Sequence, residues 1–365
     1  MALNCGIIGL SNIGKTTVFN CMSNTKAESS NYAFSATKSN KGIVEVPDLR
    51  LYEIDKLINS EKVVPATVEI VDVPGLAKGA NQGEGVGNKF LVDLQQSEAL
   101  IHVLRCFDDD NLAHIEGSID PIRDMEIVDF ELQVRDLDLV ERKIVRMEKL
   151  IKSGDKDAKK GIEVLTKYKD HFENFGNARD IDVNEDEKQY VKELLLLTEK
   201  PVIYVCNVDD ASAVSGNSYS KLVNDKLNNE SSEVLIIAGK LEEEIAELED
   251  INDRTEFLDD AGLKEPGVNK LIRAAYDVLN LQAFFTAGPK EVKAWTIKKG
   301  MTAPQASGVI HSDLERGFIR AEVMKYNDFI ELGSEQAVKD KGRFHVEGKS
   351  YVVEDADIMH IRFNV

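Results

Sequence analysis

The chain has 365 residues, of which 42% are hydrophobic and 30% are charged, a composition typical of a folded protein with room for two or three domains. Its formal net charge of −20 opposes general electrostatic binding to nucleic acid, because the phosphates would be repelled. No apolar run approaches the roughly 18 residues needed to cross a bilayer, and no signal peptide is visible. We therefore expect a cytoplasmic protein that contacts neither membranes nor specific DNA sequences.

Short apolar stretches recur through the first two thirds of the chain and alternate with helical stretches. Stretches that are apolar on both faces and separated by helices are typical of a parallel sheet covered on both sides. The sequence therefore predicts an α/β fold with a doubly wound, mostly parallel sheet. The predicted strands are residues 3–9, 68–73, 99–105, 201–206 and 234–238.

A phosphate-binding loop is predicted between the first strand and the helix that follows it. Gly9 to Thr16 match the pattern G-x-x-x-x-G-K-[ST] in the strand–loop–helix context that a P-loop requires. Gly9 and Gly14 let the loop turn its N–H groups toward phosphate oxygens. Lys15 would contact the β- and γ-phosphates, and the Thr16 hydroxyl would complete the shell of a bound Mg²⁺. Further predicted nucleotide contacts are Asn12, Ile13 and Thr17.

A D-x-x-G element, Asp72 to Gly75, ends the next predicted strand. In this pattern Asp72 would hold Mg²⁺ and the N–H group of Gly75 would contact the γ-phosphate. Leu76 follows, where many GTPases carry a glutamine that orients the attacking water, and an apolar side chain cannot do this. Hydrolysis is therefore expected to be slow or to use another group. The glycine-rich residues 79–88 predict a switch segment, with a plain surface loop as the alternative.

One of the histidines is a candidate for a role in hydrolysis. His114 lies in an acidic loop after the strand that ends at Arg105, and a histidine that titrates near neutral pH could orient or deprotonate the water. The alternative is a solvated loop histidine. His102, inside a predicted strand, is expected to be packed, and His311 is expected to support the fold of the C-terminal domain or a partner contact.

The stretch from Asn207 to Asp210 ends a further strand, in the place of the guanine-reading motif N-K-x-D. Asp210 favours guanine, because a carboxylate facing N1 of adenine would be poorly paired. Val208 replaces the lysine whose stem packs on the guanine ring, which argues against guanine. From these residues alone, GTP and ATP both remain open as the substrate.

Two further regions differ in pattern from the nucleotide-binding part. Between residues 125 and 198, apolar residues recur at helical spacing and a second apolar run follows at 190–197, which predicts an antiparallel coiled-coil arm. From Glu141 to Asp170 there are ten Lys+Arg against six Asp+Glu, a local charge of about +4. Predicted strands at 296–300, 317–323 and 351–354 indicate a small mixed α/β domain. The predicted domains are residues 1–124 with 199–278, 125–198, and 279–365.

The motifs together resemble those of the YchF (Obg-like) ATPases, within the TRAFAC P-loop NTPases. The resemblance covers residues 3–365. It implies a translation-associated ATPase with a G domain, a helical arm and a C-terminal TGS (β-grasp-like) domain, acting on the ribosome or a ribosomal subunit as a monomer. It favours ATP over GTP. It is carried by residues 9–17, 31–34, 72–80, 83–90, 207–210, 284–288, 294–300, 308–311 and 317–322.

The sequence departs from the family pattern at four places. Ala36 stands where the first switch carries a magnesium-binding threonine, and Thr37 could replace it only if the loop shifts. Asp210 stands in place of a glutamate, Ala238 begins the stretch that reads Ser-Ala-Lys in the family, and Ala356 replaces a glycine between two aspartates. These changes bear on switch ordering and base selectivity, while the phosphate loop is intact.

Three functions are compatible with these residues. The first is a slow ATPase that switches on the ribosome, with Asn12 holding K⁺ as related NTPases without the glutamine do; Asn12 could instead only support the loop. The second is a GTPase of the same architecture. The third is a nucleotide-stabilised binding module in which turnover is incidental. The four cysteines show no metal-ligand spacing, so buried free thiols are expected, with metal ligation as the alternative.

Overall fold

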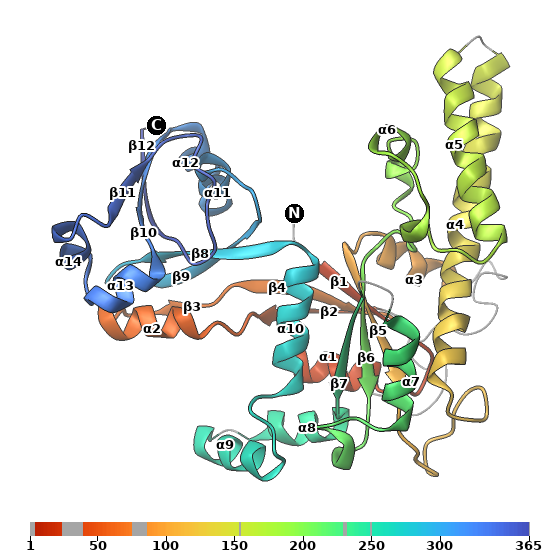
Figure 1. Cartoon of the computed structure of the whole chain (residues 1–365), viewed down its shortest axis with the longest axis horizontal. Coiled ribbons are helices and arrows are strands. Elements are labelled where there is room, and N and C mark those ends of the chain that lie inside the picture. The colour runs from red at the N-terminus through yellow and green to blue at the C-terminus, as the bar shows by residue number, and fades with distance from the viewer. Residues whose placement is uncertain are drawn as a thin grey trace. The chain divides into compact units, whose positions relative to one another are not determined.

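The structure is a computed structural model that describes residues 4–23, 39–74, 86–152, 155–228, 232–248 and 250–364 (Figure 1). It divides into two compact units, Met1–Gly42 with Glu69–Leu271 and Ile43–Val68 with Ile272–Val365. Residues 43–68 are thus grouped with the C-terminal part of the chain, whereas the predicted bounds assigned them to the nucleotide-binding part. Those three-domain bounds remain a prediction. No helix among the described residues has the length and apolar character needed to cross a membrane.

The first unit is built on a six-stranded sheet in the order β2-β4-β1-β5-β6-β7. β1 pairs in parallel with β4 and β5, and β6 pairs in parallel with β5 and β7, so the predicted parallel sheet is confirmed. Parallel strands bring their carboxyl ends to one edge, where ligands bind in such folds. The strands are β1 (Asn4–Ile8), β2 (Asn40–Glu45), β4 (Thr67–Asp72), β5 (Ala99–Arg105), β6 (Val202–Asn207) and β7 (Glu233–Ile237).

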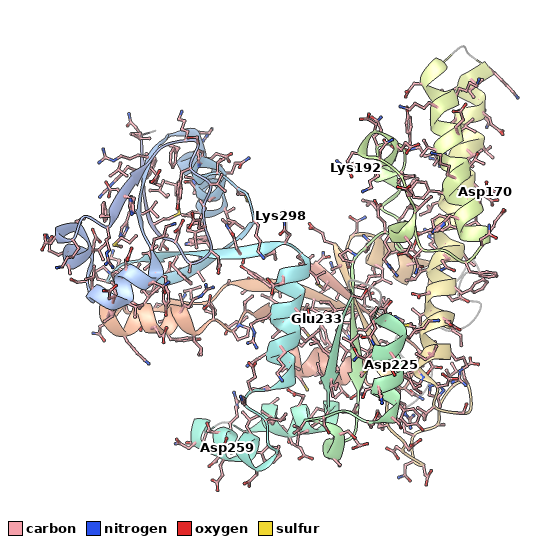
Figure 2. The ribbon with its side chains drawn as sticks, in the orientation of Figure 1. Asp170, Lys192, Asp225, Glu233, Asp259 and Lys298 are labelled. Atoms are coloured by element: carbon pink, nitrogen blue, oxygen red, sulfur yellow. The ribbon has the colours of Figure 1, made fainter. Side chains whose placement is uncertain are left out.

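Helices connect the strands of this sheet, as parallel pairing requires. Polar side chains cap the start of two of them: Asn217 caps α7 through the N–H groups of Tyr219 and Ser220, and Asp250 caps α9 through those of Asn252 and Asp253. Figure 2 labels Asp225 on α7, Glu233 at the start of β7 and Asp259 on α9. The helices are α1 (Lys15–Ser23), α3 (Val86–Gln95), α7 (Ser218–Leu227), α8 (Gly239–Glu247), α9 (Ile251–Asp260) and α10 (Gly267–Val278).

The predicted helical arm is formed by α4 (Pro121–Lys152) and α5 (Lys156–Glu173), which lie side by side (Figure 1). The position predicted for its second helix was wrong. Residues 190–197 contain only a short 3₁₀ turn, Lys192–Leu194, and Leu195 has a left-handed φ of 50°. Consecutive leucines have no helical periodicity, whereas the apolar residues of α5 do. The arm core contains Val140, Val164, Leu165, Tyr168, Phe172, Ala178, Tyr190, Val191 and Leu196.

A buried carboxylate fixes the chain where it returns from the arm to the sheet. Asp136 on α4 is fully buried and accepts hydrogen bonds from the N–H groups of Leu197 and Thr198 at 2.8 Å each, and from the Thr198 hydroxyl at 2.7 Å. Burial raises its pKa to about 6, opposed by these hydrogen bonds. The short helix α6 (Glu185–Lys188) lies in the same return segment.

The second unit has a mixed six-stranded sheet in the order β11-β10-β12-β8-β9-β3. β8 is antiparallel to β9 and parallel to β12, so the predicted mixed α/β domain is confirmed. Residues 351–354 were predicted as a strand, but they contribute only an isolated bridge between Thr302 and Val352. The strands are β3 (Val63–Val64), β8 (Leu281–Ala287), β9 (Val292–Lys298), β10 (Phe318–Met324), β11 (Phe344–Glu347) and β12 (Ile358–Phe363).

Helices and an ion pair close this unit around its apolar core. Arg50 on α2 contacts Asp355 at 2.6 Å, which joins residues 43–68 to the C-terminal region. Ala356 has a φ of 65°, a conformation that glycine adopts without a steric penalty, and this accounts for the glycine that the family carries there. The helices are α2 (Leu49–Ile58), α11 (Ala303–Ile310), α12 (Ser312–Arg316), α13 (Tyr326–Leu332) and α14 (Glu335–Asp340).

His102 on β5 is packed in the core, as predicted, and this gives the fold a pH dependence. Its side chain is 1% exposed, and its ring lies 5.5 Å from that of Tyr204. Neither ring nitrogen has a hydrogen-bond partner among the residues that the structure describes. Burial lowers its pKa from 6.5 to about 3, with Arg179 and Lys15 adding to the shift. The folded state therefore keeps His102 neutral over a range in which the unfolded state binds a proton.

We expect stability to be complete above pH 6.5 and to fall as the pH decreases, by about 1.4 kcal/mol per pH unit from this residue. His102→Leu should remove that contribution. The melting temperatures of both proteins, measured by calorimetry from pH 7.5 to 5.5, should converge or cross toward low pH. Parallel curves would show that His102 does not titrate on unfolding. His311→Leu, at an exposed position, is the matched control.

Candidate nucleotide-binding site

The loop between β1 and α1 has the backbone that its glycines were predicted to allow. Gly9 and Gly14 have φ values of 143° and 93°. A Cβ atom on Gly9 would lie 2.6 Å from the carbonyl oxygen of Val103, and one on Gly14 would lie 2.2 Å from Nδ2 of Asn207. Both positions therefore exclude any side chain. Asn12 also has a left-handed φ, of 61°, which asparagine tolerates better than most residues.

Asn207, at the end of β6, connects the phosphate loop to the start of α8 through hydrogen bonds. Its Nδ2 donates to the carbonyl oxygen of Ile13 at 2.9 Å, and its Oδ1 accepts from the N–H group of Gly239 at 2.9 Å. The side chain is 4% exposed, so both bonds are shielded from water. Asn207 was predicted as a nucleotide-binding residue, and it lies in the site as the residue that positions the phosphate loop.

Lys15, Thr16 and Asp72 meet at the edge of the sheet, as the two motifs predicted. Thr16 Oγ1 donates to Asp72 Oδ2 at 3.0 Å. Lys15 is 7% exposed and donates to the carbonyl oxygen of Leu10 in its own loop. Burial lowers the pKa of Lys15 to about 8, although the charge of Asp72 opposes the shift. Burial raises the pKa of Asp72, although Lys15, Thr16 and Asn40 oppose that shift.

The oxygen atoms at this edge fit a magnesium ion. Asp72 Oδ1 is buried and has no hydrogen-bond partner in the described part of the chain. A buried carboxylate oxygen without a partner is costly unless a cation or ordered water completes it. Thr16 and Asp72 supply hard oxygen atoms of the kind that Mg²⁺ prefers. Asn40, which ends the first switch stretch and for which the sequence pattern indicated no role, lowers the pKa of the Asp72 carboxyl through its side chain.

Several predicted switch residues lie outside the described residues. They are Ala36, Thr37, Gly75, Leu76 and residues 79–85. The γ-phosphate contact of Gly75 and the effect of Leu76 on hydrolysis remain predictions.

The predicted base-reading residues follow β6 at the same edge of the sheet. Val208 is 3% exposed, and its N–H group donates to the carbonyl oxygen of Ile237. Asp210 is exposed at the start of a 3₁₀ turn, and Asp209 caps that turn through the N–H group of Ser212. Asp210 is therefore accessible to a base, whereas the Val208 side chain is packed inside.

Thr17, a further predicted nucleotide contact, hydrogen-bonds Glu243 on α8.

His114 is held beside the phosphate loop by partners that the sequence did not indicate. Its Nδ1 accepts from the N–H group of Glu116 at 3.1 Å, and its Nε2 lies 2.8 Å from Asp124 Oδ2, at an angle poor for a hydrogen bond. Both side chains are 3% exposed. His114 is thus buried against the first turn of α4 and is not a solvated loop histidine. Asn12 Nδ2 donates to the carbonyl oxygen of Ala113, one residue away, at 3.4 Å.

Arg105 was also missed as an organising residue of this loop. It is 1% exposed, and its guanidinium donates to the carbonyl oxygens of Phe107, Leu112 and Asp109 at 3.1, 2.8 and 3.2 Å. Its position at the end of a buried strand was the available signal, since a buried arginine must find acceptors. All four cysteines are free and buried, as expected, and the described residues contain no cluster of three or more metal-ligating side chains.

P-loop nucleoside triphosphatases are the class in which a parallel sheet presents such a loop beside a strand-end aspartate, and this geometry places the chain among them. A family model described as 50S ribosome-binding GTPase matches residues 4–143. A model for the C-terminal region of YchF GTPases, described as a protein of unknown function, matches residues 281–364.

Whole-length relatives narrow the class to one family. The ribosome-binding ATPases YchF of Bacillus subtilis (strain 168) and Escherichia coli O157:H7 are 47% and 44% identical over 367 and 365 residues, covering all of both chains. The structure titled Schizosaccharomyces pombe YchF GTPase matches with a TM-score of 0.86 at 31% identity, covering 99% of this chain and 98% of that one. The chain belongs to the YchF family, and its predicted fold class is confirmed.

Lys15 is the cation that this geometry places at the phosphate loop. We expect Lys15→Ala to weaken binding of a non-hydrolysable nucleoside triphosphate about 100-fold, or about 2.7 kcal/mol, because a charge-assisted contact to phosphate is lost. Calorimetric titration in the presence of Mg²⁺ measures this. Lys41→Ala removes an exposed lysine that is paired with Glu69 at 3.5 Å, and should leave the affinity unchanged. Unchanged affinity in Lys15→Ala would contradict the site assignment.

Proposed function

We propose that this protein binds ATP, hydrolyses it slowly and uses the cycle to dock on the ribosome or a ribosomal subunit. The observation that carries the proposal is the contact of Thr16 with the buried Asp72, beside the buried Lys15, in a complete phosphate loop. The names of the bacterial relatives, ribosome-binding ATPase, support the partner and the reaction. The protein would act in the cytoplasm as a monomer, without a membrane or a specific DNA sequence as partner.

Each residue of the site has a separate role in this proposal. The N–H groups of the loop from Gly9 to Gly14 cradle the phosphates, and Lys15 leaves the carbonyl of Leu10 to contact the β- and γ-phosphates. Thr16 and Asp72 hold Mg²⁺, which when bound offsets charge on the phosphate oxygens. Gly75 contacts the γ-phosphate through its N–H group.

ATP is the proposed substrate and GTP the alternative. The buried Val208 offers no lysine stem to pack on guanine, which removes one of the two features of a guanine site. The exposed Asp210 is the feature that favours GTP. The relatives carry both names, since the bacterial proteins are named ATPases and the fission yeast structure is titled a GTPase.

Phosphate release from ATP and from GTP, with and without purified ribosomes, tests the proposal. We expect release with ATP below the enzyme median of about 10 per second, stimulation by ribosomes, and weaker competition by GTP. Lys15→Ala is the inactive control. Preference for GTP would favour the alternative substrate. Nucleotide binding without release above the Lys15→Ala background would favour a binding module with incidental turnover.

Two side chains are proposed to compensate for Leu76 in hydrolysis. Asn12 lies in the loop with its amide nitrogen on the carbonyl oxygen of Ala113, and its amide oxygen is the group that would hold K⁺ near the phosphates. His114 would orient the attacking water after leaving Asp124. In that case His114 stays in contact with Asp124 as long as no nucleotide is bound, and it moves to the water only afterwards.

Hydrolysis rates measured in K⁺ and in Na⁺, for the wild type and for substituted proteins, distinguish the contribution of Asn12 from that of His114. If Asn12 holds K⁺, hydrolysis should be faster in K⁺ than in Na⁺ at equal ionic strength, and Asn12→Ala should abolish the difference. If His114 orients water, His114→Ala should lower kcat at least tenfold in both salts and leave KM unchanged. The exposed His311→Ala is the control. Equal rates in both salts exclude the potassium site, and an unchanged kcat in His114→Ala excludes the histidine.

A further inference from the structure

The distal part of the helical arm carries cations that no carboxylate neutralises. Arg146, Lys149 and Lys152 lie near the end of α4, and Lys159 lies in the first turns of α5. All four side chains are exposed, and within the described part of the chain none of them forms an ion pair. We call these four residues the arm tip. Figure 1 shows the C-terminal end of α4 and the N-terminal end of α5 directed away from the sheet of the first unit.

Cations nearer the sheet on the same two helices are paired. Arg142 contacts Asp138 at 2.8 Å, and Lys143 contacts Glu193 at 3.0 Å. On α5, Lys167 contacts Glu187 at 2.5 Å and Lys169 contacts Glu141 at 2.8 Å. Figure 2 shows Asp170 on this part of α5. The arm therefore has a neutralised proximal half and a cationic tip, which differs from an evenly solvated charged helix.

Two of the three carboxylates between residues 145 and 160 are engaged in contacts within the fold. Asp155 caps α5 by accepting from the N–H groups of Asp157 and Ala158. Asp157 accepts from the Tyr190 hydroxyl at 2.6 Å. Between residues 145 and 160 this leaves only Glu148 among the acidic side chains without such a role. The same stretch holds six Lys and Arg against these three acidic residues, so its net charge is positive.

The arm tip contributes little to packing. The hydrophobic cluster of the arm reaches Val140 on α4 and Val164 on α5, with Met147 partly buried against it, and the small side chain of Ala158 on α5 is buried as well. Beyond it, Leu150 and Ile151 are 47% and 38% exposed. The long cationic side chains at the tip therefore cover no core that would explain them. Their charge needs a partner outside this chain.

The arrangement suits RNA phosphates. Arg146, Lys149 and Lys152 are spaced three residues apart, so they fall on one side of α4 along about 9 Å of its axis. From Val140 to Lys152 the helix extends about 18 Å, roughly two Debye lengths at physiological salt. The tip is therefore screened from the acidic body, whose charge of −20 for the chain would otherwise repel a polyanion.

We propose that the arm tip binds the phosphodiester backbone of RNA and is the part of this protein that contacts ribosomal RNA. The inference rests on the proposed docking to the ribosome. Lysine and arginine side chains on one helix face contact phosphates without reading base sequence. Acidic protein surfaces carry cations of their own, whereas RNA presents closely spaced negative charge alone, which an unneutralised cluster matches better.

The test compares two triple variants of equal charge. R146Q/K149Q/K152Q removes three tip cations, and R142Q/K167Q/K169Q removes three paired cations from the same two helices. Glutamine keeps helix propensity, so both should fold. The probes are a fluorescein-labelled RNA duplex and purified ribosomes. For the tip variant we expect at least tenfold weaker RNA binding and a log Kd against log salt slope reduced by about 2 to 3. The control should change less than twofold, and neither should change basal hydrolysis.

Each other result overturns a defined statement. If both triple variants bind RNA equally weakly, or if the tip variant binds RNA with wild-type affinity, the arm tip is not the RNA-binding site. Loss of ribosome binding with unchanged RNA binding assigns the tip to a protein partner and overturns the RNA assignment. If the wild-type protein binds the RNA duplex through the tip but does not bind ribosomes, the proposed function fails while the phosphate-binding role stands.

Discussion

The geometry of the site depends on one buried amide. Asn207 joins the carbonyl oxygen of Ile13 to the N–H group of Gly239, so the ends of three segments are held by a single planar group. The close approach that this requires explains Gly14, whose missing side chain leaves the space that the amide fills. Because both bonds are buried, an imperfect replacement would leave unpaired polar groups. The phosphate loop therefore keeps its shape without a ligand.

The charged groups of the site are held at an electrostatic cost that a nucleotide would relieve. Lys15 and Asp72 are both buried. Burial lowers the pKa of Lys15 and raises the pKa of Asp72, and both shifts favour the neutral form of the side chain. Their mutual attraction offsets part of this cost. The phosphates would give Lys15 a second anionic partner, and Mg²⁺ would complete the free oxygen of Asp72. A site prepared in this way gains affinity because little reorganisation is left for binding.

Sequence patterns predicted the parts of the structure that local chemistry determines. Continuous apolar stretches located β1, β4, β5, β6 and β7, and the spacing of glycine, lysine and threonine located the phosphate loop. Long-range pairing was not predictable in this way. Asp124 is an ordinary helix residue in sequence, and only the fold brings it to His114. The grouping of residues 43–68 with the C-terminal unit depends on contacts such as Arg50 with Asp355, more than 300 residues apart.

The loop after β5 contacts both the phosphate loop and the first turn of α4, and so connects the nucleotide site to the arm. Arg105 fixes the backbone of this loop through three carbonyl oxygens. From there Ala113 accepts from Asn12 on one side, and His114 meets Asp124 in the first turn of α4 on the other. α4 continues without a break to Lys152. If Asn12 turned toward a nucleotide, its bond to Ala113 would be lost. If His114 left Asp124, a buried carboxylate at the base of the arm would keep its pair with Arg123 but lose the contact on its other oxygen. Changes at the phosphate loop therefore cannot leave the base of the arm energetically unaffected.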